Sequence, residues 1–378
     1  MSNSNVTLKQ IAALAGVSIT TVHRVLNNKE GCSEQLKKKI LQIAQEQGYQ
    51  VNYAAASIRK HTLYFGLVFP ATGQGHSWFL QPMMDGYLRY RQEAGRFNVV
   101  FQEHYIGSSG DPSLYGGHDM NAAVAHILRN IVNERPVAYD GLLLYDIDWN
   151  DEVLSWLHRL LGRDIPVVML EKGPADVPGL CRVNADDETA GRMAAELLSK
   201  FVHGPGTVAL VEQQLHNADP CGAAFARELV KRRPDLTLRT ATLPADTHQT
   251  ESVCRFLNDL PALQGVYCTS ARHTVAYLAA RPGLNCPPPV AIGSELFDRT
   301  HAALQDGTLD AVIDKRPFSI GYQALNRLFD HVVKNEPLPE VVNITPRIIL
   351  RANCDAYFNR KDSVYGKHNH DIEPPICP

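Results

Sequence analysis

Apolar positions in the N-terminal part of the chain recur with the spacing of short amphipathic helices. In residues 8–15 and again in residues 19–27, apolar side chains lie three and four positions apart, so each segment is predicted to be a helix with one buried face. Gly16 stands between them, where a helix that ends in a left-handed conformation needs a glycine. A third amphipathic segment follows Ser33. The pattern predicts an α-helical head, residues 1–48, built on a helix, a short turn and a second helix.

From Leu63 onwards the chain alternates short apolar runs with amphipathic stretches. Runs such as LYFGLVF, DGLLLYD and TVALVE are short and apolar, which predicts buried strands. The regular alternation of strand and helix predicts mostly parallel sheets that are covered by helices on both faces. Two such sets follow one another, the second opening with a strand at CRVN, so the predicted core is α/β with two doubly wound subdomains. In such folds ligands bind at the carboxyl ends of the strands.

The charge of the chain is divided unevenly between its two parts. Residues 1–60 carry eight Lys and Arg against three Glu, a net charge of +5, whereas the whole chain has −3, which leaves −8 for the rest. A basic head on an acidic body is typical of a DNA-binding module joined to a domain with another partner. Charge alone also fits an ordinary solvated surface.

Several classes of protein are not indicated. The N-terminus lacks the basic start and apolar run of a signal peptide, and no apolar stretch has the length of a membrane span, so we expect a cytoplasmic protein without a membrane partner. The eight cysteines are scattered without a CxxC pair, which predicts reduced thiols and no metal site. The chain has no GxSxG elbow, no Walker phosphate loop and no HExxH pair, so neither an enzyme nor a cofactor is expected.

A helix-turn-helix places its second helix in the major groove, which selects candidate DNA contacts. The outward residues near the start of that helix are Ile19, Thr20 and Arg24. Arginine commonly reads guanine with two hydrogen bonds, and Ile19 suits contact with a thymine methyl group. Polar side chains that cap the first two helices or flank this surface at phosphate height complete the predicted set: Thr7, Ser18, Thr21, His23 and Asn27. Taken singly, Arg24 could be only a solvated surface residue, and the whole pattern favours the contact.

The run VTLKQIAALAGVSITTVHRVLNNKEGCSEQLKKKILQIAQEQGY closely resembles the head of the lactose/galactose repressor (LacI/GalR) family of transcription regulators. The resemblance rests on the AGVS turn, the TV-R-LN helix and the serine-capped helix that ends in GY. His23 stands where the family usually has Ser; it either contacts a phosphate or is a tolerated substitution, and we favour the second reading.

The resemblance also implies a hinge helix in residues 49–61. In this family two such helices, one from each subunit of a dimer, open the minor groove at the centre of the operator with an apolar wedge. Ile58 occupies the wedge position here and Arg59 follows it as a minor-groove or phosphate contact. An alanine-rich linker without a DNA role is the alternative for this segment.

The body resembles the periplasmic sugar-binding fold that this family uses as its effector domain. The fold implies three crossings of the chain between two lobes. The expected divisions are a core over 62–356, with an N-lobe of 62–182 and 312–335, a C-lobe of 183–311 and 336–356, and a disordered tail over 357–378.

The same resemblance implies which residues contact an effector. Trp78 and Phe79 stand where sugar-binding relatives present aromatic rings, although either could be a core residue of its helix. Asp146 and Glu171 follow predicted strands, and carboxylates accept the hydroxyl hydrogen bonds of a sugar. The remaining candidates at strand ends are Ser270, Arg272, Glu295 and Lys315.

Cys221 is the largest departure from the family pattern. It stands in DPCGAAF, where the family typically has an arginine that grips the effector. Losing a guanidinium removes a strong bidentate donor, and Arg272 or Lys315 could supply the missing positive charge. The expected effector is a sugar or a sugar derivative.

The predicted function is therefore that of an effector-controlled repressor. A homodimer would bind a near-palindromic operator in double-stranded DNA and lose or gain affinity when the small molecule binds. The competing class is a periplasmic-type binding protein that serves transport or chemoreception. The basic head and the missing signal peptide argue against that class.

Overall fold

The structure is a computed structural model. It describes residues 6–26, 31–47, 62–71, 77–106, 120–133, 139–147, 149–174, 176–213, 219–243 and 249–358. The predicted contact Asn27, the hinge residues Ile58 and Arg59, and tail residues 359–378 lie outside the described ranges.

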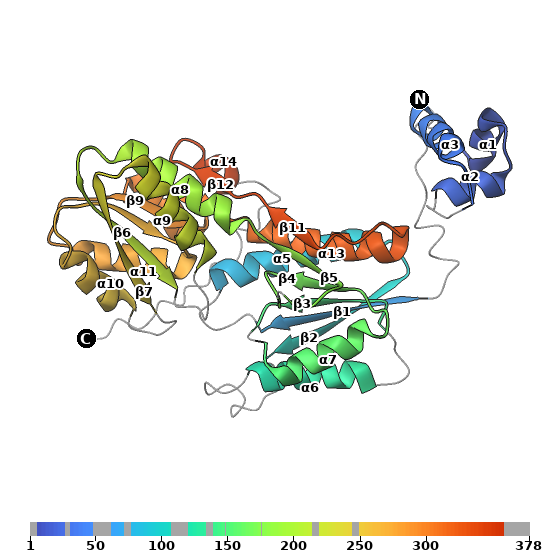
Figure 1. Cartoon of the computed structure of the whole chain (residues 1–378), viewed down its shortest axis with the longest axis horizontal. Helices are drawn as coiled ribbons and strands as arrows, with labels where there is room; N and C mark the ends of the chain where they lie inside the picture. Colours follow the sequence, from blue (N-terminus) through green and yellow to red (C-terminus); the bar gives the residue numbers. More distant parts are fainter. Residues whose placement is uncertain are drawn as a thin grey trace.

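Three helices form the head: α1 (Leu8–Ala15), α2 (Ile19–Leu26) and α3 (Glu34–Glu46). They pack around a small core in which Ile11, Val22 and Ile40 are fully buried (Figure 1). Thr7 caps α1 in a reciprocal capping box with Gln10. Gly16 has φ 71, the left-handed conformation that ends α1 and turns the chain toward α2. The helix, turn and helix predicted for this segment are present.

The first sheet is parallel and has the strand order β11-β5-β4-β3-β1-β2. Its strands are β1 (Leu63–Pro70), β2 (Val99–Ile106), β3 (Gly141–Tyr145), β4 (Val167–Leu170), β5 (Leu180–Ala185) and β11 (Val341–Ile344). Helices α5 (Ser77–Ala94) and α13 (Pro317–Lys334) cover one face, and α6 (Met120–Asn133) and α7 (Asp151–Leu161) cover the other (Figure 1). We call this part the N-lobe.

The second sheet has the order β12-β10-β9-β8-β6-β7 and is parallel except for β12. Its strands are β6 (Gly206–Gln213), β7 (Leu236–Leu243), β8 (Leu263–Cys268), β9 (Val290–Ser294), β10 (Ala311–Asp314) and β12 (Arg347–Ile349). The helices of this part are α8 (Asp187–Phe201), α9 (Pro220–Arg232), α10 (Gln249–Asn258), α11 (Ala271–Ala280), α12 (Asp298–Asp306), α14 (Cys354–Phe358) and the 3₁₀ turn η2 (Arg281–Gly283). We call this part the C-lobe.

The chain passes between the two sheets three times: after β5, after β10 and after β11. These crossings differ from the expected divisions after residues 182, 311 and 335. The CRVN strand, expected to open the second set, is β5 and pairs with β4 and β11 in the first sheet. Likewise β10 pairs in the second sheet and β11 in the first. A count of alternating strands and helices cannot assign a strand to a sheet when the chain leaves that sheet directly after it.

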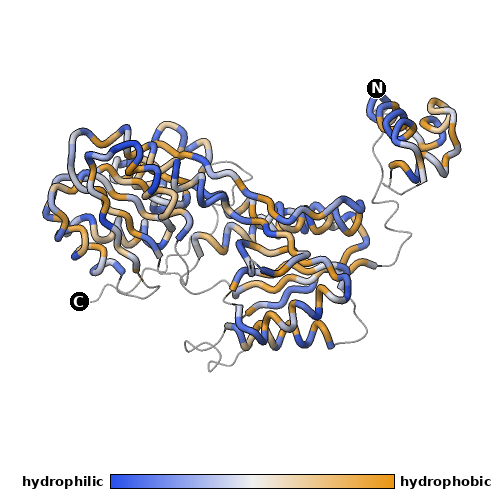
Figure 2. The backbone as a smooth tube through the Cα atoms, viewed as in Figure 1, coloured by the Kyte–Doolittle hydropathy of each residue, from blue (hydrophilic) through white to orange (hydrophobic). Residues whose placement is uncertain are grey.

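Two glycines let α5 and α13 approach closely and so fix the position of α13 on the N-lobe. A Cβ atom at Gly86 would overlap the backbone carbonyl of Phe318, and one at Gly321 would overlap the carbonyl of Met83. Figure 2 shows apolar residues concentrated along the strands and the inner sides of the helices. At the C-terminal end, Tyr357 and Phe358 belong to α14 and not to the expected tail. No helix in the described ranges is long and apolar enough to cross a membrane.

Candidate functional site

The second helix of the head presents a polar surface on the side away from its core. Val22 and Val25 are buried against the other two helices. The opposite side is exposed and carries Ser18, Ile19, Thr20, His23 and Arg24, with Ile19 48% exposed. This is the surface that a helix-turn-helix would place in the major groove.

Two predicted contacts in the head have structural roles of their own. The Ser18 hydroxyl accepts from the backbone N–H of Thr21 at 3.1 Å, and the two hydroxyls lie 2.9 Å apart, so Ser18 caps α2. Thr7 accepts from the Gln10 backbone N–H at 3.4 Å while its own N–H donates to the Gln10 side chain at 2.7 Å. Both residues keep the helix starts in place, where backbone N–H groups are available to phosphates.

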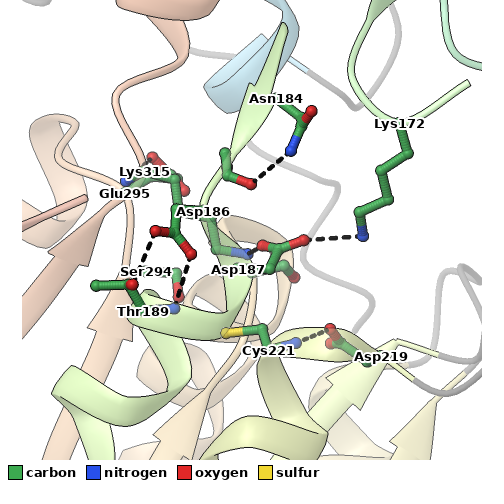
Figure 3. A network of polar contacts seen from close by, with 12 residues as sticks. Lys172, Asn184, Asp186, Asp187, Thr189, Asp219, Cys221, Ser294, Glu295 and Lys315 are labelled. Carbon is green, nitrogen blue, oxygen red and sulfur yellow. Dashed lines mark hydrogen bonds and ion pairs between the residues drawn. The ribbon is translucent and has the colours of Figure 1, made fainter. Parts of the chain in front are cut away.

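At the carboxyl ends of the strands in both lobes lies a cluster of charged side chains, shown in Figure 3. Lys172 follows β4 in the N-lobe, Lys315 lies in the second crossing, and Asp187 opens α8 in the C-lobe. The Asp187 carboxylate binds Lys172 Nζ at 2.8 Å and Lys315 Nζ at 2.9 Å. Burial alone would raise the pKa of Asp187, but the two ammonium groups outweigh it and lower that pKa to about 2. We call these three residues and Glu171 the interlobe cluster.

Glu171 is the member of the interlobe cluster without a hydrogen-bond partner for its buried oxygen Oε1. It lies directly after β4 with φ 79, a left-handed conformation that is strained for a residue with a side chain. Burial, and then the charge of Asp187, raise the pKa of Glu171 to about 8. The group is therefore protonated near neutral pH and can both donate and accept a hydrogen bond.

Glu295 lies in a buried network within the C-lobe. It has φ 65 and is 2% exposed, and its Oε2 accepts from the backbone N–H of Lys315 at 3.2 Å. Burial and the neighbouring Asp314 charge raise the pKa of Glu295 well above its ordinary value. Asp314 in turn binds the Arg347 guanidinium at 2.6 and 2.7 Å. These contacts make Glu295 part of the support beneath Lys315.

Cys221 does not replace the effector-gripping arginine of the family. Its thiol is fully buried and lies 3.0 Å from the Tyr267 hydroxyl, beside Phe225. Burial raises the pKa of this thiol to about 11, so it is a neutral core group. The positive charge nearby is that of Lys315, which influences both Cys221 and Tyr267 electrostatically. The sequence suggested Lys315 as one source of this charge, and the structure places it beside Cys221.

The two neighbouring aromatic residues Trp78 and Phe79 have different surroundings. Trp78, on α5 of the N-lobe, stacks on Phe297 of the C-lobe with ring centroids 5.5 Å apart and an interplanar angle of 25°. Phe79 packs against the hydrophobic core of the N-lobe. The structure thus assigns the core reading to Phe79 and a contact between the lobes to Trp78.

The remaining predicted effector residues lie at strand ends. Asp146 follows β3 and accepts from the Trp149 indole N–H at 2.9 Å. Ser270 caps α11 by accepting from the His273 backbone N–H at 3.3 Å. Burial lowers the pKa of Arg272. The sequence did not single out His273, whose buried Nε2 has no hydrogen-bond partner and whose pKa burial lowers to about 4.

Lys172 and Asp187 are the functional candidates that the sequence did not identify. Asp187 looked like an acidic residue that favours the start of a helix, and its neighbour Asp186 does fill that role by capping Thr189 at 2.9 Å. Lys172 directly follows the predicted Glu171, which was the available signal. Their pairing depends on how the two lobes meet, which no local pattern contains.

One group of residues in the described ranges has donor atoms spaced closely enough for a metal ion. His301, Cys354 and Asp355 each offer one ligand atom, all within 4.8 Å of one another. His301 Nε2 and Asp355 Oδ1 are already hydrogen bonded at 2.7 Å, and Gln305 donates to the same oxygen at 2.9 Å. The group joins α12 to α14 and none of its members belongs to the interlobe cluster.

A helix-turn-helix head on a two-lobed α/β core, with ionisable side chains gathered where the strands end, defines a ligand-binding DNA regulator as the class of protein. The family comparisons agree with the geometry. The model of the bacterial regulatory proteins of the lacI family matches residues 7–52, and the model of a periplasmic binding protein domain matches residues 65–336. The chain belongs to the lacI family of bacterial regulatory proteins.

Individual relatives show the same combination. The chain is 30% identical over 205 residues to the "Probable HTH-type transcriptional repressor ExuR" of Bacillus subtilis, covering 52% of each chain. It is 20% identical over 354 residues to the HTH-type transcriptional repressor PurR of Histophilus somni, covering 91% of this chain and 98% of the relative. At 52 to 53%, it spans about half the length of ExuR and of three other PurR repressors.

Among solved structures, the complex of the transcriptional regulator CelR with cellobiose has a similar fold. The TM-score is 0.55 at 18% identity, and the match covers 92% of this chain and 99% of that one. The curated relatives named here are transcription repressors rather than enzymes.

Proposed function

We propose that this chain is a transcription repressor that binds double-stranded DNA through α2 and is controlled by a small sugar-like effector bound between its lobes. The observation that carries the proposal is the presence, in one chain, of an exposed α2 surface and of the interlobe cluster. We further propose a cytoplasmic homodimer, which would present two α2 helices to the half-sites of a near-palindromic operator.

The DNA-reading role rests on the polarity of α2. Arg24 is exposed one turn from the start of the helix, where a side chain reaches base edges in the major groove. Ile19 leaves an apolar side chain 48% exposed on the same helix, which suits contact with a thymine methyl group. Ile58 and Arg59 remain proposed hinge contacts by family resemblance.

The interlobe cluster favours a hydroxylated effector that has no need of a net charge. Both lysines are already paired with Asp187, so an anionic ligand would have to compete with that carboxylate. The protonated Glu171 carboxyl, with an unpartnered buried oxygen, can donate to and accept from hydroxyl groups. Trp78 adds an aromatic ring against which the C–H face of a sugar can pack.

Control of DNA binding would come from contacts that join the lobes. Lys172 with Asp187, and Trp78 with Phe297, connect the N-lobe to the C-lobe at the strand ends. An effector that binds beside them changes the relative stability of two lobe arrangements. A coupling of about 1–3 kcal/mol between effector and DNA is typical of such systems.

The experiment that tests the proposal is a selection of genomic DNA fragments by the purified full-length protein, repeated with a panel of neutral sugars. We expect a short near-palindrome whose recovery one sugar decreases or increases. Recovery of fragments without a shared motif, at a level that salt alone removes, would contradict the DNA-reading role.

Replacement of Arg24 by Ala sharpens the same experiment. Because Arg24 is placed to read a base, R24A should relax the preference at one position of each half-site, which corresponds to about 1–3 kcal/mol in discrimination. The matched control is R227A, since Arg227 is an exposed arginine of the C-lobe. If R24A weakens binding to all sequences equally, Arg24 contacts a phosphate.

A further inference from the structure

A cavity of about 410 Å³ lies beside α13 and the edge strand β11, apart from the interlobe cluster. We call it the hinge pocket. Its walls include Arg316 and Thr345, and none of the four residues of the interlobe cluster lines it. Its volume falls within the range of small-molecule sites in proteins.

The hinge pocket is electropositive. Arg316 and Arg327 are among its lining residues, and no Asp or Glu is. The nearest carboxylate in the chain, Asp314, accepts from the backbone N–H of Arg316 at 3.2 Å, while its charge is paired with Arg347. Two guanidinium groups that share one pocket without an acid favour an anionic ligand.

Two buried atoms on the wall of the hinge pocket lack hydrogen-bond partners. Arg327 Nε is a donor and Gln323 Oε1 is an acceptor, and neither has a partner. The two residues lie four positions apart on α13 and so share one side of the helix. An unmet buried donor or acceptor is costly, and a ligand with both an anionic oxygen and a hydroxyl would satisfy the pair.

The rest of the wall suits a sugar-sized molecule. Phe318 and Tyr322 stack at 6.4 Å with an interplanar angle of 18° and give the pocket an aromatic side. Asn343 of β11 is exposed and adds an amide. We propose that the hinge pocket is a second ligand site, for a small hydroxylated anion such as the phosphate ester or the carboxylate form of a sugar.

The position of the hinge pocket gives this ligand a regulatory consequence. Arg316 lies in the second crossing between the lobes and Thr345 in the third, and Arg316 Nη1 donates to the Thr345 carbonyl at 3.4 Å. An anion bound between these residues would favour one arrangement of the crossings. It would therefore change the affinity for the effector, and the effector would change the affinity for the anion by the same factor.

Titration calorimetry of the full-length protein at fixed ionic strength tests the site. The probes are glucose 6-phosphate, gluconate, inorganic phosphate and glucose. We expect one anion to bind per chain. Binding of glucose 6-phosphate but not gluconate identifies a phosphate-ester site, and binding of both identifies a site for either anion. Inorganic phosphate alone measures the contribution of the charge.

Variants separate the hinge pocket from the interlobe cluster. N343D adds a negative charge to the pocket yet keeps the oxygen that accepts from Asn184 Nδ2 at 2.8 Å, so the fold is preserved. We expect N343D to weaken anion binding about tenfold or more. T237D, which adds the same charge on the exposed edge strand β7, and E171Q in the interlobe cluster should leave it unchanged.

Two results would overturn the proposal. One is that none of the three anions binds to the wild-type protein. The other is that N343D binds the anion as tightly as wild type, or that E171Q abolishes binding, because either places the anion elsewhere. A neutral-sugar response that survives in N343D leaves the proposed repressor function standing, so the two proposals can fail separately.

Discussion

The interlobe cluster and the hinge pocket are both lined by cations, but they differ in how those cations are paired. In the interlobe cluster, Lys172 and Lys315 bind opposite oxygens of one carboxylate, that of Asp187. In the hinge pocket, Arg316 and Arg327 share the walls with amides and aromatic rings and with no acid. The first arrangement is electrically self-contained, and the second is left open.

The difference teaches what each site can select. A self-contained cluster adds no net attraction for an anion, so it discriminates through the direction of its hydrogen bonds, as sugar sites do. An open pair of guanidinium groups gains most from a ligand that carries charge. One chain can therefore respond to a neutral sugar and to an anion without either occupying the other's site.

The largest expected effect follows from removing the shared acid. D187A leaves Lys315, whose side chain is 13% exposed, as an unpaired charge, so we expect a loss of about 3–5 kcal/mol in the free energy of unfolding. Chemical denaturation of the full-length protein measures it. The paired variant D187A/K315M removes the unpaired charge and should recover a large part of the loss.

An exposed acid with two basic neighbours provides the control. Glu196 pairs with Lys200 and Arg232 on the surface of the C-lobe, and E196A should cost no more than about 0.5 kcal/mol. If D187A proves no more costly than E196A, the interlobe cluster is not the self-contained buried unit described here.

The second prediction concerns pH and the unpartnered Glu171. In the folded protein its pKa is about 8, whereas the ordinary value of 4.5 applies to the unfolded chain. Between these values the folded state holds the extra proton, so the free energy of unfolding falls as pH rises through this window and levels off above it. E171Q removes this dependence. Because the residue is only half-buried, we expect the advantage of E171Q over wild type to grow by roughly 2 kcal/mol from pH 5 to pH 8.

Thermal or urea unfolding at the two pH values measures this change. H158Q serves as the control, since His158 is an exposed residue of α7 outside both sites. An advantage that is equal at pH 5 and pH 8 would mean that the Glu171 carboxyl is ionised throughout and that a neutral donor is missing from the interlobe cluster.

The parts of the fold that depend on local pattern could be predicted from the sequence. The head is an example, because caps such as Thr7 and turns such as Gly16 are set by their immediate neighbours. The alternation of strands and helices likewise gave two parallel-sheet subdomains. The crossing points could not be placed, since β5 belongs to a sheet whose last strand, β11, comes much later in the chain.

The candidate site was predicted only in part, for a related reason. Glu171 and Lys315 could be selected as strand-end residues, but their common neighbour Asp187 acquires its role only when the lobes meet. Trp78 and Phe79 are adjacent in sequence and lie on different sides of α5, so composition could not tell which of them is a core residue. The buried position of Cys221 depends on Tyr267, from a different strand.

The smallest expected effect is on the stability of the hinge pocket. Arg316 makes a weak contact with the Thr345 carbonyl at 3.4 Å and lies near a second guanidinium, so replacing it with Gln removes little attraction and some repulsion. We expect R316Q to change the free energy of unfolding by no more than about 0.5 kcal/mol, in contrast to D187A. The same denaturation experiment decides the point. A loss comparable to that of D187A would mean that Arg316 is held by an internal partner, and the pocket would then be as self-contained as the interlobe cluster and would lose its reason to bind an anion.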